Sequence, residues 1–124
     1  MVKTQSSRMV GVDMDVTWQK FLRHKVNSFI KWDLVRFFHD NPHTADTAEN
    51  IASVVGRDAN TVIRELDGLV KAEVLKKETV AGQGIYRLST DSDVRETVHD
   101  FVVACHNREF REKAINHVMH GMGF

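Results

Sequence analysis

The 124-residue sequence has one cysteine, one proline and no long apolar run. The single Cys105 cannot form a disulfide within the chain, which agrees with a reducing compartment. No stretch of about 18 apolar residues is present, so we expect no membrane-spanning helix. Residues 1–15 also lack the continuous apolar segment of a signal peptide. These absences make the cytoplasm the expected location.

A surplus of positive charge is missing too, because 17 basic residues balance 17 acidic ones. Proteins that hold DNA phosphates usually carry excess cations. Residues 17–40 have five basic and two acidic side chains, and residues 74–90 have three basic side chains and one acidic side chain. Residues 58–73, by contrast, have two basic and four acidic side chains. Positive charge is therefore concentrated in two segments, within a chain whose length suits one compact domain.

Residues 46–75 predict two short helices joined by a tight turn. Their apolar residues recur at helical spacing: Ala48, Ile51, Ala52 and Val55 in the first helix, and Val62, Leu66 and Leu69 in the second. Asp46 or Thr47 can cap the first helix, and Asp58 can cap the second. Gly56 is suited to the positive φ with which a chain leaves a helix. The pattern predicts a helix-turn-helix with its second helix over residues 58–71.

Further elements are predicted on both sides of this motif. An amphipathic helix over residues 17–40 precedes it, with Thr17 as its N-cap and Asn27-Ser28 as a candidate interruption. Two runs of strand-favouring residues follow it and flank a glycine turn at residues 81–84, with Gly82-Gln83-Gly84 as its tip. The expected order is helix, helix-turn-helix and β-hairpin.

This order resembles the winged-helix transcription regulators, in forms similar to the MarR and ArsR groups. The resemblance rests on TAENIASVVG, on DANTVIRELDGLVKAEVL and on the hairpin, and it covers residues 18–89. It implies a mainly α fold with a small β-hairpin, namely a winged helix-turn-helix with additional N- and C-terminal helices. It also implies that residues 43–45 pair with the hairpin as a third strand.

We expect a flexible N-terminal arm over residues 1–15, a winged helix-turn-helix domain over residues 16–90 and C-terminal helices over residues 91–124. The apolar stripe of the last segment changes phase after Cys105, so two helices are expected there, with Asn107 capping the second. Their apolar surface exceeds what so small a core covers. Because terminal helices form the dimer in the MarR-like and ArsR-like groups, we expect a homodimer.

The candidate DNA contacts lie on the second helix of the motif and on the hairpin. They are Asn60, Thr61 and Arg64 for base edges or flanking phosphates, and Lys76, Lys77, Gln83 and Arg87 for the DNA backbone. In the alternative, Arg64 pairs with an acidic neighbour and the lysines only protect an edge strand. Glu65 and Asp67 depart from the usual family pattern, so tight autonomous binding is in question.

The sequence favours a DNA-binding transcription regulator, and the alternative is a winged-helix protein-interaction module without autonomous DNA binding. We expect no enzyme, because no nucleophile elbow, phosphate loop or catalytic carboxylate pair occurs. His117 and His120 share a helix face near Cys105 and His106, but the spacing does not match the family's metal ligands. Neither a metal nor a cofactor is expected, and Cys105 is predicted to be a buried, inert thiol. The expected partners are double-stranded DNA and a second copy, with no membrane, and a small-molecule effector is left open.

Overall fold

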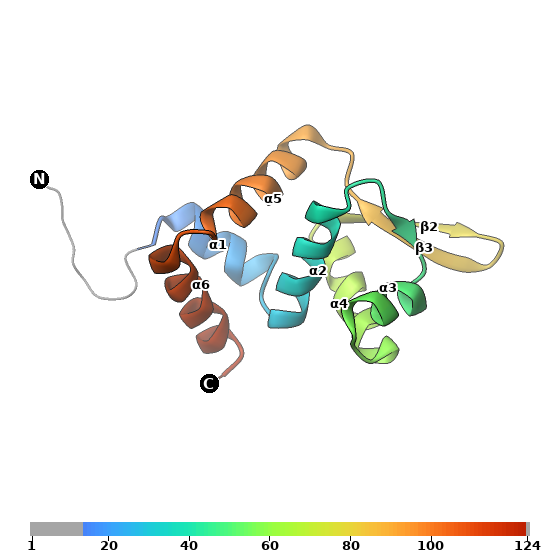
Figure 1. Cartoon of the computed structure of the whole chain (residues 1–124), viewed down its shortest axis with the longest axis horizontal. Coiled ribbons are helices and arrows are strands. Elements are labelled where there is room, and N and C mark those ends of the chain that lie inside the picture. Colours follow the sequence, from blue (N-terminus) through green and yellow to red (C-terminus); the bar gives the residue numbers. More distant parts are fainter. Residues whose placement is uncertain (1–13, 124) are drawn as a thin grey trace, which may run out of the picture.

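A computed structural model describes residues 14–123, which form six α-helices and a three-stranded antiparallel sheet. The elements are α1 (Val16–His24), α2 (Phe29–Asp40), β1 (Ala45–Asp46), α3 (Ala48–Val55), α4 (Ala59–Lys71), β2 (Leu75–Val80), β3 (Gln83–Leu88), α5 (Ser92–Ala104) and α6 (Arg108–Gly121). The helices α1, α5 and α6 gather at one end, and the β2–β3 hairpin projects from the other (Figure 1). This order of elements is consistent with a winged-helix regulator fold.

The predicted helix over residues 17–40 is two helices, and they separate at the candidate interruption. Ser28 is extended and caps α2, because its Oγ accepts from the backbone N–H of Lys31 at 3.1 Å. Thr17 as the first N-cap was wrong: Asp15 caps α1, and its carboxylate accepts from the Thr17 N–H at 2.7 Å. A carboxylate two residues upstream satisfies the orphan donor and starts the helix earlier. Of the arm predicted over residues 1–15, residues 1–13 lie outside the described residues.

The structure confirms the N-caps that the sequence predicts for the two helices of the helix-turn-helix. The hydroxyl of Thr47 accepts from the N–H of Asn50 at 3.2 Å, and the carboxylate of Asp58 accepts from the N–H of Thr61 at 3.0 Å. Gly56 follows α3 with φ of +72°, in the left-handed region. The turn between α3 and α4 therefore begins at Gly56, which ends α3, and finishes at Asp58, which caps α4.

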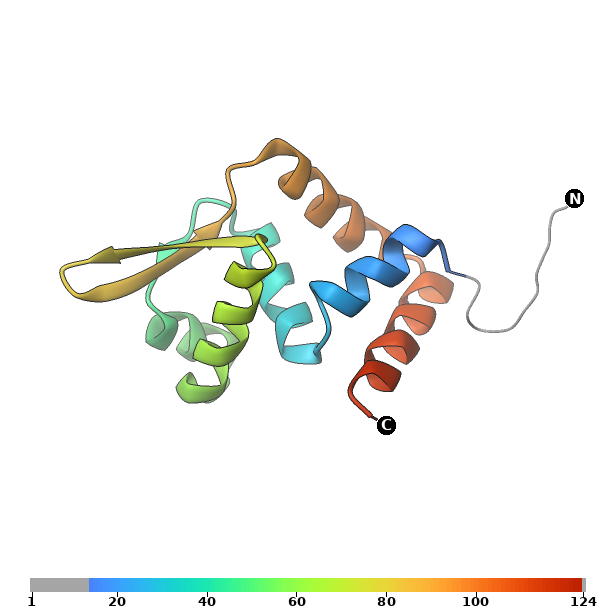
Figure 2. The same ribbon diagram turned by 180° about the vertical axis from the view of Figure 1, so that it is seen from behind.

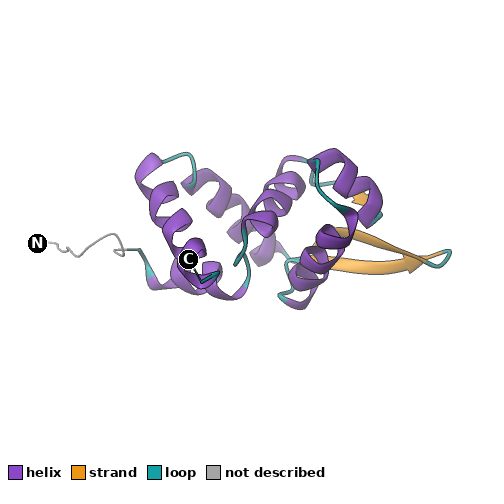
Figure 3. Ribbon diagram, turned by 90° about the horizontal axis from the view of Figure 1, so that it is seen from below, coloured by secondary structure: helices purple, strands orange, loops and turns teal. Residues whose placement is uncertain are grey.

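The hairpin differs from the prediction at its tip. The turn residues are Ala81 and Gly82, both with positive φ, and Val80 pairs with Gln83. A two-residue turn with two positive φ values matches the twist of the strands, so Gln83 and Gly84 belong to β3 and not to the tip. The third strand is present at Ala45–Asp46, at the end of the predicted 43–45 segment, and it pairs with β3. Figure 3 shows the sheet at one end of the helical body.

One hydrophobic cluster joins the helix-turn-helix to the terminal helices. Val98 and Phe101 of α5 and Val118 of α6 are buried in it. Trp18 of α1 lies against the rings of Phe101 and Phe110, at centroid distances of 5.9 and 5.6 Å. The apolar stripes of α5 and α6 are thus largely covered within one chain. Their exposed large apolar residues among those described are Val103, Met119 and Met122. None of the helices in residues 14–123 has the length and apolar character needed to cross a bilayer.

We expect Gly56→Ala to lower the free energy of unfolding by about 1–2 kcal/mol, because only the left-handed backbone opposes a side chain there. An added Cβ at Gly56 would meet nothing within 4 Å. Equilibrium denaturation in urea measures the change. Gly121→Ala is the matched control, since Gly121 also has open space around it but has no positive φ. Equal unfolding free energies for the two variants would contradict the assigned turn.

Candidate nucleic-acid interface

The inner side of the helix α4 packs against the hydrophobic core through three side chains. Val62, Leu66 and Leu69 have no exposed surface, as their spacing predicts. Burying each one contributes roughly 2 kcal/mol relative to an exposed side chain. This inner contact sets which side of α4 faces outward.

One flank of α4 rests on the start of α2. The hydroxyl of Ser28 donates to the carboxylate of Glu65. Next to it, the side chain of Lys31 crosses Gly68 so closely that a Cβ at this glycine would lie 2.7 Å from Lys31 Cε. The Ser28–Glu65 hydrogen bond and the close packing of Lys31 on Gly68 therefore position this side of α4 against α2. Neither contact can be predicted from local sequence patterns.

The other flank of α4 is joined to the hairpin. Tyr86 donates its hydroxyl to Asp67 Oδ1 at 2.7 Å, and Lys77 Nζ lies 3.3 Å from the same oxygen and 5.1 Å from the centre of the Tyr86 ring. Hydrogen bonds to Tyr86 and to Asp67 raise the pKa of Lys77, while burial first and the bond to Asp67 second raise the pKa of Tyr86. Lys77 is therefore charged at neutral pH and turned toward α4.

The acidic residues of α4 have hydrogen-bond partners within the protein. Glu65 and Asp67 both face partners within the protein, and Asp58 caps the helix. The outward face contains Asn60, Arg64 and Lys71, which are exposed and share one side at spacings of four and seven. Among the described residues, neither Arg64 nor Lys71 has a hydrogen-bond or ion-pair partner for its side chain. Asp67 shares this side, and its side chain is 46% exposed although it is bonded to the hairpin. The face therefore has two cations and one carboxylate, a surplus of one positive charge, although residues 58–71 together have more acidic than basic side chains.

Lys71 was missed by the sequence interpretation. It lies seven residues after Arg64, which is two helical turns, so the spacing itself contained the signal. The net charge of residues 58–73 hid this signal, since a segment sum does not distinguish the faces of a helix.

The remaining predicted residues fall into two groups. Lys76 and Gln83 are exposed on the hairpin. Thr61 is half-buried and donates its hydroxyl to Asp58 at 3.2 Å, while Arg87 forms an ion pair with Glu78 at 3.0 Å. Arg87 lies opposite Lys76 in the strand register, and Tyr86 lies opposite Lys77. Because neighbouring strand residues alternate, Lys76 and Arg87 lie on the face of the hairpin that α4 does not contact.

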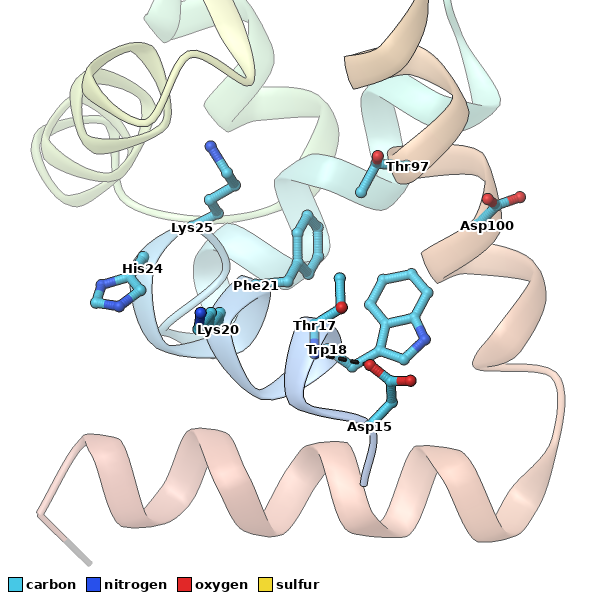
Figure 4. Close-up of a pocket in the computed structure, with 9 residues that line it drawn as sticks. All are labelled: Asp15, Thr17, Trp18, Lys20, Phe21, His24, Lys25, Thr97 and Asp100. Carbon is cyan, nitrogen blue, oxygen red and sulfur yellow. Dashed lines mark hydrogen bonds between the residues drawn. The ribbon is translucent and has the colours of Figure 1, made fainter. Parts of the chain in front are cut away.

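A hollow of about 510 Å³ lies between α1 and α5, and Figure 4 shows its side chains. Trp18 and Phe21 form its apolar part. Charges of both signs line it, including Asp15, Asp100, Lys20 and Lys25. Nζ of Lys25 donates to the carbonyl of Ala72 at 2.7 Å, just after α4. The hollow therefore adds no cationic surface, but its Lys25 holds the end of α4 to α1.

The structure partly supports the predicted inert thiol. Cys105 is half-buried, and burial raises its pKa to about 11, although the guanidinium groups of Arg111 and Arg36 act to lower it. The thiol is thus protonated at neutral pH. Within residues 14–123, no group of three or more His, Cys, Asp or Glu side chains is placed to hold a metal ion.

Comparisons with known proteins concern the fold. No protein-family model matches the chain, and no curated protein sequence matches it either. A solved structure described as "Possible transcriptional regulator from Methanosarcina mazei Go1" is similar, with a TM-score of 0.52 and 16% sequence identity. The match covers 80% of this chain and 86% of that chain. At this identity the likeness shows a shared fold alone, mainly helical with a small antiparallel sheet.

We expect Cys105 to react with a disulfide reagent at least about tenfold more slowly in the folded chain than in the unfolded chain at pH 8. The raised pKa leaves less thiolate, and the folded rate should keep rising toward pH 11, above the ordinary thiol value of 9.0. Stopped-flow absorbance with and without guanidinium chloride measures both rates. Equal rates in the two states would contradict the raised pKa.

Proposed function

We propose that this protein is a DNA-binding transcription regulator of the winged helix-turn-helix type, similar to the MarR and ArsR groups, which acts in the cytoplasm. The observation that supports this proposal most strongly is the outward face of α4. Asn60, Arg64 and Lys71 are exposed there, while Glu65 and Asp67 bond to other parts of the protein. This face offers amide and cationic donors, and its one carboxylate, Asp67, is bonded to Tyr86 and Lys77 of the hairpin.

The position of α4 suits entry into a major groove. It packs on α3, α2 and β2, and the terminal helices α5 and α6 lie beyond α2 (Figures 1 and 2). A helix is about 10–12 Å wide, and the major groove is about 12 Å wide. Arg64 then reaches guanine O6 and N7, Asn60 reaches adenine N6 and N7, and Lys71 reaches a phosphate. We propose residues 58–71 as the recognition segment.

The hairpin, over residues 76–87, serves as the wing in this proposal. Lys76 and Gln83 are free to meet the flanking backbone, because both are exposed. Lys77 and Arg87 have partners within the hairpin and α4, so they contribute charge near the DNA and also fix the wing. Thr61 acts similarly from the start of α4, where it faces the DNA while bonded to Asp58.

A net charge of zero is compatible with this function because the charges are separated in space. Residues 91–124 have six acidic and four basic side chains, and they form α5 and α6 on the far side of α2. At physiological ionic strength, exposed charges beyond about 8 Å are largely screened. The cationic face of α4 is therefore felt by DNA more strongly than the acidic terminal helices are.

Arg64→Ala should weaken binding to a cognate duplex by about 1–3 kcal/mol, because it removes a bidentate base contact. Fluorescence anisotropy with labelled DNA, at two salt concentrations, measures the loss. Arg108→Ala is the control: Arg108 is an exposed arginine on α6 that pairs only with Glu112, and its removal should leave the affinity unchanged. Matching affinities for the Arg64 variant and the unaltered protein would contradict the assigned face.

The second candidate function is a protein-interaction module without autonomous DNA binding. The neutral charge favours it, as does Val54 of α3, whose exposed fraction of 68% is high for an apolar residue. The same titration decides between the two functions, since DNA binding must weaken steeply as salt rises. Absence of salt-sensitive binding would leave the interaction module as the better account.

We also propose that the regulator is a homodimer formed through residues 91–124, separate from the winged domain of residues 16–90. Met119, near the end of α6, and Met122, just after it, are exposed and lie three residues apart. Light scattering coupled to size exclusion should therefore give twice the chain mass of 14.2 kDa. Met119→Asp should shift the mass toward one chain, because it places a charge in the interface. A single-chain mass for the unaltered protein would contradict the dimer.

A further inference from the structure

A second hollow, of about 520 Å³, lies where α2, α5 and α6 meet, away from the outward face of α4. We call it the two-arginine pocket. Its charged, aromatic and thiol side chains come from α2 and from the α5–α6 junction: Trp32, Arg36, Asp40, Cys105, His106 and Arg111. Its volume falls in the range of pockets that hold small organic ligands.

The two arginines of this pocket come from different helices, and one carboxylate, that of Asp40, lines the pocket with them. Arg36 has no hydrogen-bond or ion-pair partner among the described residues. Within residues 14–123, Arg111 donates to one group, the backbone carbonyl of Cys105, at 2.7 Å. Both arginines line the same hollow as Cys105. Both guanidinium groups also act to lower the pKa of the Cys105 thiol.

The other groups in the pocket balance only one of these two charges. The Cys105 thiol stays protonated at neutral pH because burial raises its pKa to about 11. Asp40 is the acidic side chain of the pocket, and its carboxylate is also bonded to Nδ1 of His39 at 2.9 Å. Two arginines and one carboxylate leave the pocket with a surplus of one positive charge. Two like charges placed together favour the binding of an anion that bridges them.

We propose that the two-arginine pocket binds a nucleotide, with a phosphate group between Arg36 and Arg111 and the base against Trp32. Two guanidinium groups present more donors than one carboxylate can accept, whereas a phosphate offers three terminal oxygens and up to two charges. Trp32 supplies an aromatic surface for a heterocycle, and its own position is fixed by Phe101 at a centroid distance of 5.3 Å. His106 adds a further donor at the rim.

Calorimetric titration of the full chain with AMP, GMP, CMP and UMP tests the proposal. At least one nucleotide should bind with a dissociation constant below about 1 mM. Arg36→Ala and Arg111→Ala should each weaken this binding about tenfold or more, because each removes a charged hydrogen-bond donor. Arg108→Ala is the matched control, since Arg108 is an arginine of the same helix α6 that does not line the pocket.

Two further titrations measure the contributions of the base and of the phosphate to nucleotide binding separately. Adenosine and inorganic phosphate should each bind at least about tenfold more weakly than the best nucleotide, because each lacks one of the two contacts. Thermal denaturation of both arginine variants checks that they fold. Arg36→Ala should not melt earlier, since it loses only a like-charge neighbour. Arg111→Ala also loses its hydrogen bond to the Cys105 carbonyl, so the Arg36 variant decides if the Arg111 variant is destabilised. The proposal is overturned if no nucleotide binds at millimolar concentration, if either arginine variant binds as tightly as the unaltered chain, or if phosphate or adenosine alone binds as tightly as the nucleotide.

Discussion

The burial of one side of α4 is the constraint on which the remaining structure depends. Val62, Leu66 and Leu69 are inaccessible to solvent, so the opposite side of the helix has to face outward. The bonds of Glu65 with Ser28 and of Asp67 with Tyr86 then limit rotation in either direction. A helix held on three sides presents its fourth side in one orientation, which is what recognition of a rigid duplex requires.

The polar contacts beside α4 also show how a helix with more acids than bases can present a cationic surface. A carboxylate that accepts hydrogen bonds from its own protein has part of its charge compensated by those donors. Because Glu65 is bonded to Ser28, and Asp67 to Tyr86 and Lys77, the cations Arg64 and Lys71 outweigh the acidic residues on the outward face. The distribution of charge over faces, and not its total, decides which partner fits.

Local signals in the sequence predicted the helix-turn-helix well, and long-range contacts explain what they missed. Thr47, Gly56 and Asp58 act on backbone groups within a few residues of themselves, so their roles could be predicted directly. The Ser28–Glu65 and Tyr86–Asp67 bonds join residues 37 and 19 positions apart, which no periodicity shows. The inward turn of Lys77 depends on the second of these bonds, and the two-arginine pocket depends on how α6 returns to α2. Hence the elements were predictable, but the arrangement of charges around them was not.

The orientation of α4 and its role are tested most directly by nuclear magnetic resonance of the labelled protein titrated with duplex DNA. If the account is correct, the amide signals that shift most belong to Asn60, Arg64 and Lys71, with smaller shifts at Lys76 and Gln83 on the hairpin. The signals of Val62, Leu66 and Leu69 should stay protected from hydrogen exchange throughout. Shifts confined to α5 and α6, or no shifts at low salt, would contradict the claim that the outward face of α4 binds DNA.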